Sequence, residues 1–364
     1  MDENYPISLS GKKVLLRLDL NLPAVGDDYR LQAVLPTIQS LAASASRVVV
    51  VSHLGVDGSQ SLVGVAKRLN DFLPITFVAD WSALDDPAAF TGRVVLAENL
   101  RRDPGEMTHD EQLARRLAGW GDVFINDAFA SSHRRHASIV GVPKFLPTYL
   151  GPRFKLEVAE LSRAFQPDRP FVVILGGAKF STKLPLVDRL LKTADQIFVV
   201  GALAHAYFTA RGYSVGQSLL ETSFQLPASL IVDPHLIWPS DVLLRDGGGV
   251  TRATRPAEVS STDTIVDVGP ETTAKIAAAA KLARLVIWNG PLGLFENGYG
   301  EATAAVAQAV ASSVAHSIVG GGDTVAAVRQ FNNLDNFDFV STGGGAMLEF
   351  LATGTLPGLE AING

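Results

Sequence analysis

The chain has 364 residues, of which 47% are hydrophobic and 19% charged, and this balance excludes an intrinsically disordered protein. Lys and Arg at 31 positions against Asp and Glu at 37 give a formal net charge of −6, so the chain lacks the basic surplus typical of nucleic-acid-binding proteins. The absence of cysteine excludes disulfides, thiolate metal sites, iron–sulfur clusters and cysteine nucleophiles.

At roughly 150 residues per domain, this length predicts two domains that each bury a core. The amino terminus, Met1-Asp2-Glu3-Asn4, has neither the basic start nor the apolar run of a secretory signal. No run approaches the roughly 18 apolar residues that a membrane span needs. We therefore expect a cytoplasmic protein that binds neither membranes nor nucleic acids.

Short apolar runs rich in valine and isoleucine recur along the chain, and segments with the period of an amphipathic helix lie between them. The apolar runs are residues 14–18, 48–51, 94–96, 123–125, 172–175, 197–200, 285–288 and 318–319. The helical segments are residues 62–72, 183–191, 272–282, 303–310 and 324–331. This alternation predicts an α/β fold with buried parallel sheets.

A domain boundary is expected near the middle of the chain. An amphipathic helix is predicted over residues 153–165, and the helix-breaking run Gln166-Pro167-Asp168-Arg169-Pro170 follows it. Further along, Gly247-Gly248-Gly249 predicts a mobile surface loop, for which a purely connecting role is favoured over a functional one.

Three glycine clusters in the second half follow apolar runs and open helices: Gly176-Gly177-Ala178-Lys179, Gly320-Gly321-Gly322-Asp323-Thr324 and Gly343-Gly344-Gly345-Ala346. Without Cβ atoms, backbone N–H groups can approach a phosphate closely, and a helix start adds its positive dipole end. One cluster alone is more often an ordinary tight turn. Three at strand ends favour phosphate binding.

The two standard nucleotide-binding signatures are missing, since neither Gly-x-x-x-x-Gly-Lys-Ser/Thr nor a Gly-x-Gly-x-x-Gly between strand and helix occurs. This disfavours a P-loop enzyme and a typical dinucleotide dehydrogenase. Asp323 follows a glycine run at a predicted helix start, where its carboxylate could hold Mg²⁺ between nucleotide phosphates. A helix cap is an equally good interpretation of Asp323 from spacing alone.

The first half has a different set of polar residues, most of them just past a predicted strand: Asp19, Asn21, Arg30, His53, Arg101 and Arg134. Ligands of open α/β sheets bind outside the carboxyl ends of the strands, so these side chains can form a basic cleft for a small anionic metabolite. Any one of these arginines alone is better explained as a solvated surface residue. His133 and His136 lack the further ligands that a zinc site needs.

The motifs that carry a family resemblance run through the chain in order. They are Leu16-Arg17-Leu18-Asp19-Leu20-Asn21-Leu22-Pro23, Ser52-His53-Leu54-Gly55, Asn126-Asp127-Ala128-Phe129, His133-Arg134-Arg135-His136-Ala137-Ser138, Leu175-Gly176-Gly177-Ala178-Lys179, Trp288-Asn289-Gly290-Pro291, Gly320-Gly321-Gly322-Asp323-Thr324 and Ser341-Thr342-Gly343-Gly344-Gly345-Ala346. Through them the chain resembles the phosphoglycerate kinase family over nearly its whole length.

This resemblance implies a two-lobed enzyme of glycolysis and gluconeogenesis, monomeric and hinge-bending, with two Rossmann-like lobes joined by an interdomain helix. The reaction would transfer a phosphoryl group between 1,3-bisphosphoglycerate and Mg-ADP, giving 3-phosphoglycerate and Mg-ATP. Residues 1–152 would form the triose-binding lobe, 153–166 the interdomain helix and 167–342 the nucleotide-binding lobe. Residues 343–364 would return to the first lobe.

The family's functional positions can be carried over residue by residue. The triose would be bound by Asp19, Asn21, Arg30, His53, Arg101 and Arg134. The nucleotide side would consist of Gly177, Ala178, Lys179, Lys183, Gly201, Asn289, Pro291, Glu296, Gly320, Gly321, Gly322, Asp323 and Thr324, with Glu296 on the ribose hydroxyls and Asp323 on Mg²⁺. The catalytic set would be Arg30, Lys179, Gly321 and Gly344.

The chain departs from the family pattern at three places. Val56 follows Gly55 where the family has a phosphate-binding arginine, and Thr182 replaces an aspartate. Val200-Gly201-Ala202 stands where the family has a run of glycines that the purine approaches. These changes leave two main alternatives for the function. An unrelated acyl-phosphate kinase is a distant third. The protein is either an active phosphoglycerate kinase or a divergent relative with weakened catalysis that binds a phosphometabolite or a protein partner.

Overall fold

The computed structural model describes residues 7–22, 28–86, 92–331 and 334–363. Met1-Asp2-Glu3-Asn4 and Pro23, which the sequence analysis used, lie outside these residues. The chain divides into two compact units, Met1–Ala159 with Thr355–Gly364, and Glu160–Gly354. Among the described residues, no helix is both long and apolar enough to cross a membrane.

The first unit contains a six-stranded parallel sheet in the order β3-β4-β2-β1-β5-β6. Its strands are β1 (Lys13–Leu18), β2 (Arg47–Val51), β3 (Thr76–Val78), β4 (Val94–Ala97), β5 (Val123–Asp127) and β6 (Thr148–Leu150). Its helices are α1 (Asp28–Ser44), α2 (Val63–Asn70), α3 (Ser82–Asp85), α4 (Gly105–Thr108), α5 (Glu111–Ala118) and α14 (Pro357–Asn363).

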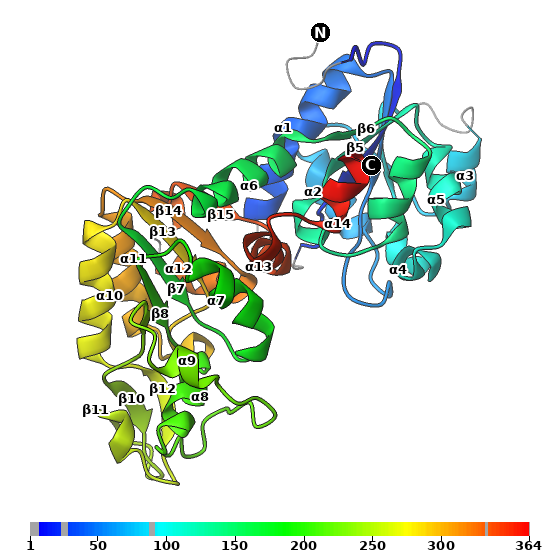
Figure 1. Ribbon diagram of the computed structural model, residues 1–364. Coiled ribbons are helices and arrows are strands. Elements are labelled where there is room, and N and C mark those ends of the chain that lie inside the picture. Colours follow the sequence, from blue (N-terminus) through cyan, green and yellow to red (C-terminus); the bar gives the residue numbers. More distant parts are fainter. Residues whose placement is uncertain (1–6, 23–27, 87–91, 332–333, 364) are drawn as a thin grey trace. The chain divides into compact units, whose positions relative to one another are not determined.

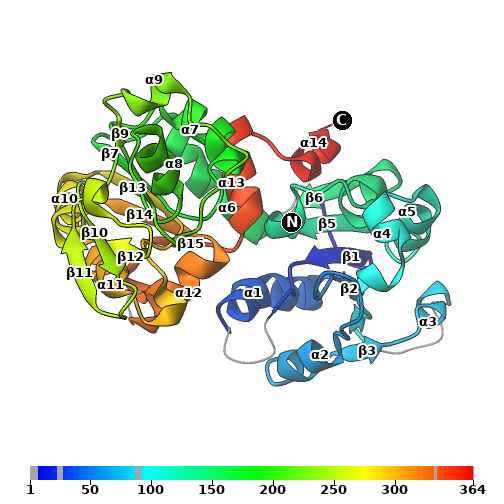
Figure 2. The ribbon, with the colours of Figure 1, turned by 90° about the horizontal axis from the view of Figure 1, so that it is seen from below.

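Alternation along β1 places its side chains on the two faces of this sheet. Val14 and Leu16 belong to the core that the sheet shares with α1 and α2, and Leu15 belongs to the core shared with α5. Figures 1 and 2 accordingly show α1 and α2 on one face and α5 on the other. The same alternation directs Arg17 to the α5 face, where it is fully buried.

The second unit contains a six-stranded parallel sheet in the order β15-β14-β13-β7-β8-β9 and a three-stranded antiparallel sheet in the order β11-β10-β12. Its strands are β7 (Phe171–Leu175), β8 (Gln196–Val199), β9 (Leu236–Ile237), β10 (Val242–Arg245), β11 (Thr251–Thr254), β12 (Thr264–Val268), β13 (Leu285–Asn289), β14 (His316–Gly320) and β15 (Phe339–Ser341). Its helices are α7 (Leu184–Leu190), α8 (Leu203–Ala210), α9 (Ala228–Ile231), α10 (Pro270–Leu282), α11 (Glu301–Ala311), α12 (Gly322–Gln330) and α13 (Gly344–Thr353).

The helices of the second unit cover both faces of its parallel sheet. Helix α13 packs against α7, whereas α10 packs against α11 and α11 against α12 (Figures 1 and 2). Every predicted strand and helix is present, so the α/β fold with two parallel sheets is confirmed. The antiparallel sheet was not predicted, and Gly247-Gly248-Gly249 lies in the turn between its strands β10 and β11.

The compact units differ from the expected domain boundaries in two places. The middle helix is α6 (Pro152–Ser162), and the division falls within it, between Ala159 and Glu160. The return to the first unit begins at Thr355 and not at residue 343, because α13 packs on α7 within the second unit.

Candidate active site

The polar residues of the first unit gather at the carboxyl edge of its sheet. From β1 the chain continues to β2 on one side, and β5 lies on the other, so the strand order reverses between β1 and β5. Crevices at such a reversal are where open α/β sheets bind ligands. Asp19 follows β1, His53 follows β2, Arg101 follows β4 and Arg134 follows β5.

Asp19, Asn21 and Arg30 form a connected group after β1. The Asp19 carboxylate accepts from the Asn21 backbone N–H at 3.2 Å, and Asn21 Oδ1 accepts from the Gly55 N–H at 3.0 Å. Arg30 Nη1 donates to the Asn21 carbonyl at 3.1 Å and lies 3.9 Å from Asp19 Oδ2. The half-buried Arg30 guanidinium has five donors, and its contacts with the described residues do not use all of them, so N–H groups are left for a ligand.

His53 is held in one tautomer by Arg17, whose Nη2 lies 3.1 Å from His53 Nδ1. A guanidinium only donates, so Nδ1 must accept and the ring proton must be on Nε2. Burial, and next the charge of Arg17, hold the pKa of His53 far below its ordinary value, which keeps the ring neutral. His53 therefore offers an Nε2–H donor to a ligand.

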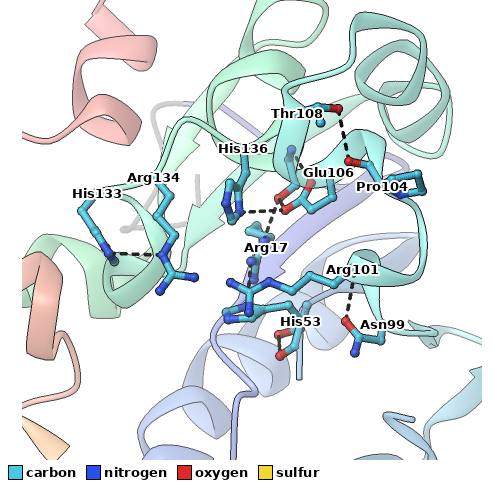
Figure 3. Close-up of polar contacts among 12 residues, drawn as sticks. Arg17, His53, Asn99, Arg101, Pro104, Glu106, Thr108, His133, Arg134 and His136 are labelled. Atoms are coloured by element: carbon cyan, nitrogen blue, oxygen red, sulfur yellow. Dashed lines mark hydrogen bonds and ion pairs between the residues drawn. The ribbon is translucent and has the colours of Figure 1, made fainter. Parts of the chain in front are cut away.

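Arg101 and Arg134 form a cationic cluster with Arg17, beside the neutral His53 ring. Figure 3 shows the three guanidinium groups directed toward one region beside the His53 ring. Arg101 Nη1 donates to the carbonyls of Gly55 and Val56, and Arg134 Nε lies 3.3 Å from His133 Nε2. Burial, and next the charge of Arg134, lower the pKa of Arg101. An anion here would relieve this mutual repulsion.

A buried carboxylate that no sequence motif predicted lies beneath this cluster. Glu106, which Figure 3 shows beside His136, is fully buried and accepts from Ser138 through the backbone N–H at 2.9 Å and the hydroxyl at 2.6 Å. Its Oε1 lies 3.6 Å from His136 Nδ1, and Arg17 Nε donates to the Ser138 hydroxyl at 3.0 Å. Burial opposes the charge of Glu106, but the hydrogen bonds from His136 and Ser138 and the Arg17 charge outweigh it and lower its pKa.

The second unit contains a cavity of about 350 Å³ at the carboxyl edge of its parallel sheet. Its lining includes the expected nucleotide-binding residues Gly177, Ala178, Gly201, Pro291, Glu296 and Asp323. Two of the glycines have backbone angles that favour glycine, with φ of +128° at Gly177 and +60° at Gly201. Both glycines lie in loops that line the cavity.

Lys183 and Asn289 lie beneath the glycine loops and hold them together. The Lys183 ammonium group donates to the Gly176 carbonyl at 2.7 Å and to Asn289 Oδ1 at 2.9 Å. Asn289 Nδ2 in turn donates to the Gly320 carbonyl at 2.9 Å. Burial lowers the pKa of Lys183 to about 8, and the charge of Asp323 partly offsets this effect.

The second and third glycine clusters meet each other. A Cβ placed on Gly344 would lie 3.8 Å from the Gly321 Cα. Thr324 is buried, and its hydroxyl accepts from the Gly290 N–H at 2.6 Å, so its side chain supports the loops. Asp323 is exposed in the first turn of α12. Lys179 is exposed too, and it is not part of the cavity lining.

Asp267 in the same cavity is buried, and this burial raises its pKa to about 7. Because the folded pKa exceeds the ordinary value, the native state binds the extra proton between about pH 4 and pH 7, and stability falls as pH rises through that range. We expect Asp267→Asn to raise the free energy of unfolding by about 2 kcal/mol at pH 8, because the variant has no charge to bury. The full pKa difference would correspond to about twice this value for a carboxyl group that water cannot reach. Urea unfolding at pH 8 and pH 5 measures this, and an equal difference at both values would contradict it.

The remaining part of this cavity is built by elements that the sequence analysis missed. Strand β12 and the start of β10 contribute apolar wall residues, including Val242 and Ile265. His205 of α8 lies on the same wall. These residues carry no spacing that marks them in the sequence as cavity-lining.

Comparison with known proteins gives one consistent result. The family model "Phosphoglycerate kinase" matches residues 5–354. Proteins named phosphoglycerate kinase from Roseiflexus sp. (strain RS-1) and Herpetosiphon aurantiacus are 39% and 38% identical to this chain, each alignment covering 98% of both sequences. The solved phosphoglycerate kinase structure from Coxiella burnetii matches with a TM-score of 0.85 at 38% identity, covering 98% of this chain and 97% of that one. The crystal structure from Pyrococcus horikoshii OT3 matches with a TM-score of 0.84 at 29% identity, with the same coverage.

Proposed function

The chain belongs to the phosphoglycerate kinase family and is a phosphotransferase with a carboxyl group as acceptor, and from this premise we propose how its residues divide the reaction. The first unit would bind 3-phosphoglycerate or 1,3-bisphosphoglycerate through its cationic cluster with Asp19, Asn21 and Arg30. The second unit would bind ADP or ATP in its cavity. The observation that supports this division best is the cationic cluster in one unit and the glycine-lined cavity in the other.

The chemistry requires charge neutralisation more than proton transfer. In the ATP-consuming direction the nucleophile is a carboxylate that is already ionised at neutral pH, so no general base is needed. Positioning and stabilisation of the charge on the transferring group then carry the catalysis. We assign this stabilisation to Arg30 and Lys179, with backbone N–H groups at Gly321 and Gly344.

Magnesium would be held by Asp323 together with nucleotide phosphates. No group of three His, Cys, Asp or Glu side chains suited to a metal occurs among the described residues. Mg²⁺ in phosphoryl-transfer sites is commonly bound by one or two carboxylates plus substrate phosphates, and exposed Asp323 on the cavity wall fits that pattern. Bound there, the ion would neutralise phosphate charge. Glu296 on the same wall is assigned to the ribose hydroxyls.

A coupled assay with 3-phosphoglycerate and Mg-ATP tests this function. We expect turnover that depends on Mg²⁺. Normal triose binding without turnover with either ATP or GTP would instead support the divergent, non-catalytic relative. A monomeric state, a cytoplasmic location, hinge bending and the absence of nucleic-acid and membrane partners belong to the same proposal, and rest on the family and the sequence.

Val56 is expected to weaken the hold on the triose phosphate. Its side chain is 81% exposed in the turn whose carbonyls Arg101 contacts. One cation that could replace the missing arginine, Arg102, is already paired with Glu98 at 3.2 Å. A charge-assisted hydrogen bond restored by Val56→Arg should lower KM for 3-phosphoglycerate by about ten- to a hundredfold at low salt.

Steady-state kinetics at several salt concentrations measure this effect, which should shrink as salt increases. Val250→Arg is the matched control, since it adds the same charge at a side chain that is 62% exposed in the second unit. An equal decrease in KM for both variants, or none for Val56→Arg at low salt, would contradict the assignment.

A further inference from the structure

One polar side chain on the apolar wall of the nucleotide cavity has an atom that no described residue hydrogen-bonds. His205 lies in α8, one turn after Gly201, and is only 4% exposed. Its neighbours on the helix, Ala204 and Phe208, belong to the small core that α8 forms with the antiparallel sheet. His205 lines the cavity together with both of them.

The hydrogen bonding of His205 fixes its tautomer. Nδ1 lies 2.6 Å from the Leu219 carbonyl oxygen. A carbonyl oxygen only accepts, so Nδ1 must carry the proton. Burial lowers the pKa of His205, the bond to Leu219 offsetting part of this effect, and the ring is therefore neutral. Nε2 is consequently an unprotonated acceptor.

This acceptor is open to the cavity. Nε2 has no hydrogen-bond partner in the part of the chain that the structure describes. It is also not among the unpartnered side-chain atoms that are fully buried there, so Nε2 itself remains accessible. Two polar neighbours in the cavity lining are already engaged with the backbone. Gln217 Nε2 donates to the Ser261 carbonyl at 2.7 Å, and the Ser218 hydroxyl accepts from the Ile265 N–H at 2.8 Å.

The two sides of the cavity differ in chemistry. Gly177, Ala178 and Asp323 form the side suited to phosphates and magnesium. Phe208, Val242 and Ile265 form an apolar wall suited to the flat faces of a purine. A base against this wall would bring one of its polar edges to His205.

We propose that His205 selects the base of the nucleotide: its Nε2 accepts a hydrogen bond from a base amino group, so the enzyme prefers adenine to a 6-oxopurine. A carbonyl oxygen at position 6 would place two lone pairs against each other and leave both acceptors unsatisfied in a buried site. This inference rests on the proposed nucleotide-binding function of the cavity. His205 lies about one helical turn after Val200-Gly201-Ala202, where the chain departs from the family's glycine run.

Three nucleoside triphosphates that differ only at position 6 of the purine test the proposal. ATP carries an amino group there, purine riboside triphosphate a hydrogen, and inosine triphosphate an oxygen. At saturating 3-phosphoglycerate we expect kcat/KM to fall in that order, with about three- to tenfold lost at each step. The same order is expected for Kd measured by calorimetry.

Two substitutions of His205 separate its acceptor from its volume. His205→Phe keeps a ring but removes the acceptor, so ATP and purine riboside triphosphate should become equal within about twofold. His205→Gln supplies an amide that either donates or accepts, so inosine triphosphate should gain and its ratio to ATP should approach one. Tyr207→Phe is the control, because Tyr207 stacks on Trp238 at 4.4 Å and is absent from the cavity lining.

The outcomes distinguish this proposal from the proposed function. Unchanged base ratios in active His205→Phe and His205→Gln, or the same change in Tyr207→Phe, would overturn the role of His205. Absence of turnover with all three nucleotides in the parent would contradict the proposed function, and the order of Kd values would then still decide the role of His205. Parental ratios that do not favour ATP would also overturn it.

Discussion

Replacing Lys179 with alanine is expected to lower kcat by about 10²- to 10³-fold, and Arg30→Ala should have an effect of the same size. Both cations are assigned to oxygens of the transferring phosphoryl group, where charge is redistributed in the transition state. Arg30 has N–H donors beside Asp19 that no acceptor among the described residues takes up, and Lys179 is exposed at the first glycine cluster. Ground-state binding should change less than kcat, because each interaction strengthens only as the reaction proceeds.

Steady-state kinetics in both directions of the reaction measure kcat and KM for the two variants. Lys192→Ala and Arg115→Ala are the controls, since each removes one exposed positive charge from the same unit as its counterpart. Both controls should retain kcat within about twofold. For Arg30→Ala, a large increase in KM for 3-phosphoglycerate with unchanged kcat would place Arg30 in binding alone.

The sequence was most informative where a strand is buried on both faces. Central strands such as β1, β2 and β13 are near-continuous apolar runs, and the polar residues that follow them mark the carboxyl edge of each sheet. Strands β6, β9 and β15 contain only two or three residues, which is too short for a periodic signal. Helix α1 has Pro36 in its interior, so its pattern does not read as a continuous helix.

The motifs also indicated the candidate site better than they indicated what each side chain does there. Thr324 and Lys183 stand in nucleotide-binding motifs, yet the hydroxyl of Thr324 and the ammonium group of Lys183 hold the glycine loops. Spacing along the chain cannot reveal such contacts, because a single side chain, Lys183, binds both Gly176 and the distant Asn289. Glu106 has no local pattern that separates it from a solvated glutamate, and only the fold brings it to Ser138.

The buried pair of charges beneath the cationic cluster, the proposed triose site, is expected to contribute strongly to the stability of the first unit. Arg17 and Glu106 are both fully buried, and the Ser138 hydroxyl connects them. Arg17→Met should lower the free energy of unfolding by about 3–5 kcal/mol, because it leaves the Glu106 charge buried without its compensating cation. It should also weaken triose binding, since His53 loses the donor that fixes its tautomer.

A double-mutant cycle with Glu106→Gln isolates this coupling. Removing both charges leaves no unpaired buried ion, so Arg17→Met/Glu106→Gln should recover more than about 1 kcal/mol relative to the sum of the single variants. Urea unfolding of the full chain gives the free energies, and peptide-resolved hydrogen exchange assigns the loss to the first unit. Arg115→Ala breaks the exposed pair with Glu111 at 2.7 Å and should cost less than about 1 kcal/mol. Strictly additive effects in the cycle would contradict the coupling. The stability of the proposed triose site would then have to come from the packing around Arg17, since the Arg17 charge would contribute nothing through Glu106.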